Sequence, residues 1–281
     1  MKMINSYEEI IASFAKMNGK FDLDLYREYA DAISPTLFDK VWDDCQDYDF
    51  DAEVVPVMEN AMRKLDKLNE INDSFQQMVD VNLARVIQIA NVQFPVQIIL
   101  YLGLCNGAGW ATMLDGKPAV LLGVEKMIEL DWCDANSIGS LVYHELGHIW
   151  HAEIGTMNQA ASGTTEEYLS QLYQEGVAMY FELLCVGDYA SWSASKGDWW
   201  QWCLNHEEEI AREYLRRLNA GESCQDFFGD WCSYMGQSNL GYFLGYRLID
   251  HLSKKYTMLE LANLTLESVA DKFSAYVGSK F

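Results

Sequence analysis

One short stretch rich in β-branched residues interrupts a chain whose apolar residues otherwise recur at helical spacing, and this interruption most constrains the fold. Residues 96–104 read VQIILYLGL, and residues 110–114 and 119–124 form two further apolar runs. Asp115 and Gly116 stand between those two runs, and an Asp-Gly pair in that place is typical of a tight β-hairpin turn. The chain is therefore predicted to be α+β and mainly helical, with a small antiparallel or mixed sheet.

Helical periodicity dominates on both sides of this stretch. In residues 7–17 (YEEIIASFAKM), for example, Ile10, Ile11 and Phe14 share one face of a helix. Helices are predicted at 7–17, 24–33, 38–45, 52–68, 72–90, 136–153, 165–185, 197–219, 239–255 and 266–276. Residues 1–94 are expected to form a helical N-terminal region, and residues 95–281 a core that contains the sheet. The two parts are compatible with one continuous domain.

The charge balance excludes several kinds of partner. The 281 residues include 42 Asp and Glu against 20 Lys and Arg, which gives a formal net charge of -22. An acidic surface repels phosphate backbones, so nucleic acid is not an expected partner. The longest apolar runs, such as Pro118–Val124, are far shorter than the about 18 residues that a bilayer span requires. No membrane association is expected.

Cysteine usage and the first residues agree on the compartment. The seven cysteines are odd in number, irregularly spaced and without a CxxC pair, so they are expected to be reduced thiols. The opening MKMINSYEEI has no apolar run of the kind that a signal peptide carries. A cytoplasmic location is expected.

A candidate metal site lies in the helix predicted at 136–153. Residues 144–148 read HELGH, so His144 and His148 are four residues apart and face the same side of that helix. This spacing lets two imidazoles share one metal ion, while Glu145 can reach a metal-bound water as a general base. A helical His pair can also be a hydrogen-bonded part of a protein core, so the motif needs a third ligand to support it.

A catalytic zinc ion takes three protein ligands and keeps one position open. The candidates for the third ligand are His151, Glu166, Glu167, Glu175, Glu182 and Asp188. The ring of His151 is expected to point along the helix surface, away from the metal, where it either contacts a metal ligand from outside or lies at the protein surface. Glu175 stands among Leu172, Val177 and Phe181, and a charge with such apolar neighbours needs a partner such as zinc.

Three motifs in order resemble the gluzincin metallopeptidases, most closely their aminopeptidase branch. HELGH is followed by QEGVAMYFE at residues 174–182, which is similar to the third-ligand helix of that branch. Residues 242–249, YFLGYRLI, are similar to its tyrosine helix. The chain as a whole looks most like small bacterial proteins described as predicted zinc-dependent proteases. The resemblance covers roughly residues 95–255.

The resemblance implies a zincin-like fold and the hydrolysis of peptide bonds in peptide or protein substrates. It makes His144, His148 and Glu175 the ligands of one zinc ion per chain. It makes Glu145 the base that activates water, and Tyr242 the donor that stabilises the developing oxyanion. An aromatic residue at helical spacing also suits simple core packing, and that alternative for Tyr242 stays open.

The chain departs from the aminopeptidase pattern in three places. The interval between His148 and Glu175 is longer, Gln174 replaces the usual Asn, and the GAMEN segment that anchors a substrate amine is missing. Glu125 is a candidate for binding an amine, although a surface carboxylate at the end of a strand is the preferred interpretation. Residues 106–112 (NGAGWAT) and 123–127 (GVEKM) lie in a region comparable to the missing segment, and an edge strand there could pair with an extended peptide.

Two features outside the motifs have structural interpretations. Glu207–Glu209 is expected to be a solvated helix face with Arg212 and Arg216 as partners. Trp192, Trp199, Trp200 and Trp202 suit either helix packing, which is preferred, or a stacking platform for a ligand.

The function that these observations favour is a zinc metallopeptidase. The first alternative is a catalytically inactive zincin-fold protein with a binding or regulatory role. The second is a zinc hydrolase that acts on an amide other than a peptide bond.

Overall fold

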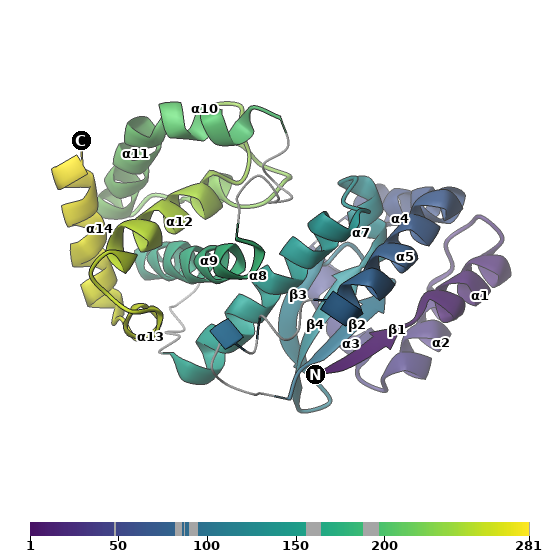
Figure 1. The fold of residues 1–281 in the computed structure, drawn as a ribbon. Helices are drawn as coiled ribbons and strands as arrows, with labels where there is room; N and C mark the ends of the chain where they lie inside the picture. The colour runs from purple at the N-terminus through teal and green to yellow at the C-terminus, as the bar shows by residue number, and fades with distance from the viewer. Residues whose placement is uncertain are drawn as a thin grey trace. The chain divides into compact units, whose positions relative to one another are not determined.

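A computed structural model (Figure 1) describes residues 1–47, 49–81, 86, 88–89, 95–155, 164–187 and 197–280. These residues are mostly helical and include one mixed four-stranded sheet, which confirms the α+β, mainly helical prediction. The chain divides into two compact units, Met1–Leu146 and Gly147–Phe281. No helix in the described ranges has the length and apolar character to cross a membrane.

The first unit contains the sheet. Its elements in chain order are β1 (Lys2–Asn5), α1 (Tyr7–Met17), α2 (Leu23–Ile33), α3 (Leu37–Asp44), the short helices Cys45–Asp47 and Phe50–Val54, α4 (Val55–Arg63), α5 (Leu65–Val81), β2 (Gln97–Tyr101), β3 (Gly109–Leu114), β4 (Lys117–Gly123) and α7 (Val124–Glu129). Helix α8 (Ala135–Ile154) follows and continues past Leu146.

The sheet has the strand order β1-β2-β4-β3, so β2 and β4 are central and β3 is an edge strand. β1 and β2 are parallel, β2 and β4 are parallel, and β3 runs antiparallel to β4. Asp115 and Gly116 join β3 to β4 with φ values of 50° and 71°, as a type I′ hairpin turn requires. The predicted hairpin is therefore confirmed.

Two elements of this unit were not predicted. β1 has only four residues and adds a parallel strand to a region expected to be wholly helical. α7 begins directly after β4, so the edge strand considered for residues 123–127 is wrong, whereas the one considered for residues 106–112 overlaps the edge strand β3. Both elements are too short to show a periodicity of their own. Their positions depend instead on partners that are distant in sequence.

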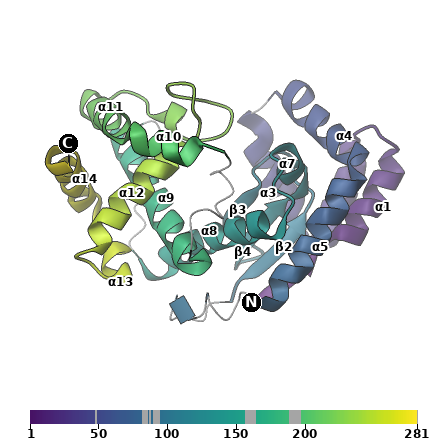
Figure 2. The ribbon, with the colours of Figure 1, turned by 45° about the horizontal axis from the view of Figure 1, so that its top comes forward.

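The segment predicted as one helix at 52–68 is divided. A π-helical turn, Phe50–Val54, precedes α4, and α5 begins only after Lys64, whose φ of -111° and ψ of 53° are not helical. The helix predicted at 72–90 is present as the end of α5 up to Val81, and much of its remainder lies outside the described residues. α5 runs beside α1, and Tyr7 donates a hydrogen bond to Asn69 where they meet (Figure 2).

The second unit is helical throughout its described part. After the end of α8 it contains α9 (Thr165–Val186), α10 (Trp199–Asn205), α11 (Glu207–Ala220), the 3-10 helix Gln225–Phe227, α12 (Leu240–Ser253), α13 (Met258–Leu261) and α14 (Leu266–Lys280). The single helix predicted at 197–219 is broken at His206, whose φ of -113° and ψ of 13° leave the helical region. The ring of His206 stacks on Trp202 at this break.

Helices α9 and α12 approach each other closely at two glycines. A Cβ added to Gly176 would overlap the backbone of Gly245, and a Cβ added to Gly245 would overlap the carbonyl oxygen of Leu172. Backbone atoms cannot move away as the end of a side chain can, so both positions need glycine. This crossing fixes the spacing between the helix that carries Glu175 and the helix that carries Tyr242.

An ion cluster around the buried Glu207 ties α11 to α12 and α14. The expected solvated face holds for Glu208 and Glu209, and Glu208 accepts a bond of 2.9 Å from Arg212, but Glu207 is 6% exposed and the expectation is wrong for it. Its carboxylate accepts a hydrogen bond of 3.0 Å from Arg247 Nε and further bonds from Tyr276 and Lys280. Burial raises the pKa of this carboxyl, but the bonds from Arg247, Lys280 and Tyr276 outweigh it, and the pKa lies below its ordinary value.

Replacing Gly245 by alanine should lower the free energy of unfolding by about 1–3 kcal/mol, because the added methyl group overpacks the crossing of α9 and α12. Urea unfolding measures this loss. Gly278→Ala in α14 is the matched control, since an added Cβ there meets nothing within 4 Å. Unchanged stability of Gly245→Ala would contradict the close contact.

Glu207→Gln should lower the free energy of unfolding at pH 7 by at least about 2 kcal/mol, because Arg247 and Lys280 lose their buried counter-charge. The folded-state pKa of Glu207 is depressed, so the stabilisation exists above the unfolded-state value of about 4.3 and is lost as pH falls through the folded-state value. Urea unfolding of both proteins from pH 7 downward should show their difference shrinking below about pH 4. A difference independent of pH would contradict an ionised Glu207.

Candidate metal centre

Helix α8 carries the HELGH motif and begins at a strong cap. The carboxylate of Asp134 accepts bonds of 3.0 Å from the backbone N–H groups of Asn136 and Ser137, which satisfies donors that the first helical turn leaves open. His144 is 8% exposed, and His148 is half-buried one turn later. The helix therefore holds both imidazoles on one face, as the spacing predicted.

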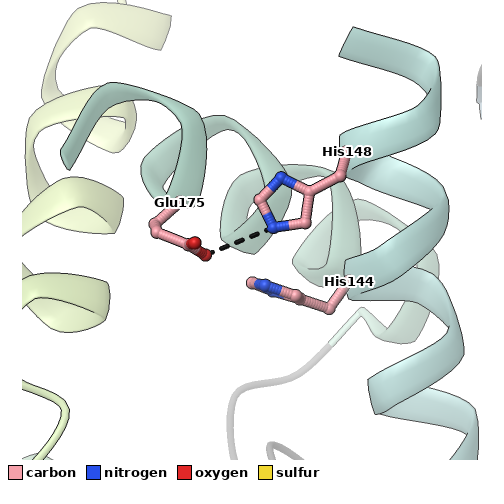
Figure 3. A group of neighbouring side chains, drawn as sticks. All are labelled: His144, His148 and Glu175. Atoms are coloured by element: carbon pink, nitrogen blue, oxygen red, sulfur yellow. Dashed lines mark ion pairs between the residues drawn. The ribbon is translucent and has the colours of Figure 1, made fainter. Parts of the chain in front are cut away.

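Glu175 comes from the middle of α9. This helix is capped by Thr164, whose hydroxyl accepts a bond from the N–H of Glu167, and it ends at Gly187 with a left-handed φ of 86°. The carboxylate of Glu175 points toward the rings of His144 and His148 (Figure 3), and its Oε2 lies 3.3 Å from Nε2 of His148.

One ligand atom from each of His144, His148 and Glu175 lies within 4.8 Å of the others. In the described ranges, this is the group of His, Cys, Asp and Glu side chains that has the geometry to hold a metal ion. Two imidazole nitrogens and one carboxylate oxygen are a donor set that suits zinc, and three protein ligands leave a fourth position for water or substrate. The residues present thus fit a metal ion such as zinc.

A glycine inside the motif sets the distance between α8 and α9. A Cβ added to Gly147 would lie 2.9 Å from Cα of Ala178 and 3.1 Å from Cβ of Phe181. Gly147 directly precedes His148, and Ala178 stands less than one turn after Glu175. The lack of a side chain at Gly147 therefore lets the two helices come close enough for His148 and Glu175 to meet.

Glu145, which adjoins His144 on α8, contacts the edge strand β3 of the first unit. It is 7% exposed, and its Oε2 accepts a hydrogen bond of 2.8 Å from the backbone N–H of Ala111 in β3. This backbone donor was not foreseen, because main-chain groups leave no mark in a sequence motif. The one available signal was Gly109 at the start of the strand, since an isolated glycine in a strand often marks a close approach.

The other candidates for the third ligand lie elsewhere. His151 is fully buried, with Nε2 3.2 Å from the carbonyl oxygen of Ala262, so the expectation of a surface group is wrong. Burial lowers the pKa of this imidazole to about 4. Glu166 and Glu167 lie in the first turn of α9, and Glu182 is buried further along it. Asp188 lies outside the described residues.

Glu125 is not the surface carboxylate that was expected. It is 1% exposed in α7, and its two oxygens accept hydrogen bonds from the backbone N–H groups of Gly103 at 2.9 Å and Cys105 at 3.1 Å. Burial raises the pKa of this carboxyl above its ordinary value, although the backbone donors act in the opposite direction. Both oxygens are used to hold the loop that leads into β3, which argues against a role in binding a substrate amine.

Tyr242 lies half-buried on α12, with its ring against Phe228 at 5.8 Å between centroids. Its role as an oxyanion donor stays a prediction. Trp199 and Trp200 pack on Phe243, and the indole N–H of Trp199 donates to the carbonyl oxygen of Ser238. These contacts agree with helix packing as the role of both tryptophans. Trp192 lies outside the described residues.

Comparisons with protein-family models, with curated proteins and with solved structures found no match to this chain. What the site does must therefore be inferred from its own residues and their geometry.

Glu125→Ala should speed hydrogen exchange at the amides of Gly103 and Cys105 by at least about 10-fold, because both donors lose their acceptor. Exchange followed by NMR or mass spectrometry measures this effect. Glu129→Ala, which removes a more exposed carboxylate from the same helix, serves as the control. If both variants exchanged at the wild-type rate in this loop, Glu125 would not be what holds it.

Proposed function

We propose that this protein is a zinc-dependent metallopeptidase of the zincin type, with His144, His148 and Glu175 as the metal ligands. The observation that carries the proposal is the meeting of two imidazoles from one helix with a carboxylate from a second helix, all within 4.8 Å. The order of the three motifs along the chain, each similar to its gluzincin counterpart, supports the same function.

When bound, zinc would lower the pKa of a water molecule and draw electron density from the substrate carbonyl. Glu145 adjoins the first ligand, and its carboxylate would accept the proton of the attacking water and pass it to the leaving amine. This step requires the ionised carboxylate of Glu145. The amide of a glutamine at this position would be a poor proton acceptor. The burial of Glu145 limits competing contacts with solvent.

Tyr242 is proposed to donate a hydrogen bond from its phenol to the oxygen on which negative charge develops. The support for this role is its place on α12, which packs closely against α9, the helix that carries Glu175. A donor held on a rigid helix does not need to reorganise during the reaction, which is the condition for strong electrostatic stabilisation.

The substrate that suits this site is an extended peptide. β3 is an edge strand, and an edge strand can pair with a peptide backbone through main-chain hydrogen bonds, here at backbone groups other than the N–H of Ala111, which Glu145 occupies. The formal charge of -22 favours the approach of neutral or cationic peptides over acidic ones.

Protein purified without chelator should contain one zinc ion per chain by elemental analysis, and it should cleave members of a peptide library. Glu145→Gln should retain the zinc and lose about 100- to 10,000-fold in kcat, because the amide cannot act as the base. His148→Ala should lose the zinc as well as the activity, since two remaining ligands bind zinc weakly.

Three results would overturn the proposal or redirect it. Absence of stoichiometric metal would remove the metal site. Full peptidase activity in Glu145→Gln would remove the mechanism. Zinc binding without cleavage of any library member would favour an inactive binding protein or an amide hydrolase with another substrate.

A further inference from the structure

Gly109, the first residue of β3, faces the carboxylate of Glu145 at very short range. A Cβ added to Gly109 would lie 2.7 Å from Oε1 of Glu145, 2.9 Å from its Cγ and 2.7 Å from Cδ1 of Leu141. Contacts shorter than 3.0 Å are essentially never made by real Cβ atoms. Any other residue at position 109 would therefore have to displace the side chains of Glu145 and Leu141, or the strand itself.

The need for glycine at this position comes from space and not from backbone conformation. Gly109 does not have a positive φ, whereas the nearby Gly107 has a φ of 152°. An alanine at position 109 would thus adopt the backbone angles without strain. What it would lack is room beside Glu145.

The same strand fixes the other oxygen of this carboxylate. The N–H of Ala111 donates to Oε2 of Glu145 at 2.8 Å. Ala111 is paired with Val120 in the ladder to β4, and opposite residues of an antiparallel pair alternate between bonded and non-bonded. The N–H of Ala111 is directed to α8 rather than to β4. One carboxylate oxygen is therefore held by a donor, and the other occupies the space that the missing side chain leaves.

We propose that Gly109 is a positioning residue for Glu145, and that its lack of a side chain keeps the carboxylate where proton transfer requires it. This inference rests on the proposed function. A general base must lie within hydrogen-bond reach of the proton that it accepts. A displacement of about 1 Å can cost on the order of 100-fold in rate.

The test compares three variants with the wild type: Gly109→Ala, Glu145→Ala and the double variant. Gly139→Ala is the matched control, because Gly139 lies on α8 as Glu145 does and an added Cβ there meets nothing within 4 Å. Zinc content, kcat and KM on a cleaved library peptide are measured for each protein. The urea midpoint is measured on the metal-free proteins, which gives a readout that does not depend on activity.

Gly109→Ala should keep one zinc ion per chain and a KM within about 2-fold of wild type, while kcat falls by at least about 10-fold. Gly139→Ala should keep the wild-type kcat. In the metal-free proteins, Gly109→Ala should lower the urea midpoint clearly in the wild-type background and much less in the Glu145→Ala background. The Glu145→Ala background lacks Oε1 and Cγ of Glu145, which are two of the three atoms that the new Cβ would meet.

Wild-type kcat in Gly109→Ala would overturn the inference. An equal loss of midpoint in both backgrounds, or loss of zinc from Gly109→Ala, would do the same, because Gly109 would then act on the fold and not through Glu145. If the wild type cleaved no peptide, the proposed function would fail. The comparison of midpoints would then still decide whether Gly109 and Glu145 are in contact.

Discussion

The pairing of Glu175 with His148 is the interaction on which the candidate site depends, and backbone contacts at glycines make it possible. A half-buried carboxylate in the middle of an apolar helix is costly unless a partner compensates for its lost hydration. His148 Nε2 at 3.3 Å is such a partner, and a shared cation would be a stronger one. Gly147 against Ala178 sets the distance between α8 and α9, and Gly176 against Gly245 sets the distance between α9 and α12. Because these are contacts with backbone atoms, the spacing of the three helices has little freedom to adjust.

Much of the fold and of the site follows from local sequence. The Asp115–Gly116 turn, α1, α8, α9 and α12 were predicted close to their observed ends, because turn chemistry and helical periodicity are local properties. The grouping of His144 with His148 is also local, since four residues of helix determine it. Glu175 could be chosen from six candidates only because its apolar neighbours and the motif around it both indicated a metal ligand.

Several errors concern burial, which depends on the whole fold. Glu207 and Glu125 were interpreted as exposed or surface groups, and His151 as a group that either supports the metal site or lies at the surface; each is buried. In each case the compensating partner is distant in sequence: Arg247 and Lys280 for Glu207, the loop at residues 103–105 for Glu125, and the carbonyl of Ala262 for His151. A charge with helical neighbours of opposite sign looks solvated from local sequence alone, and no periodicity reveals a partner tens of residues away. β1 was missed for the same reason, because its strand partner lies more than ninety residues further on.

The bond from Ala111 to Glu145 also bears on how open the edge of β3 is to an added strand. An exposed edge strand is a template on which another copy can add a strand, and natural proteins often protect such edges with charged side chains. Here a carboxylate already occupies a donor on the outer side of β3. Strand addition by a second copy would have to displace that charge from a buried position. If Glu145 acts as the proposed base, the same carboxylate also covers one backbone donor of this edge strand.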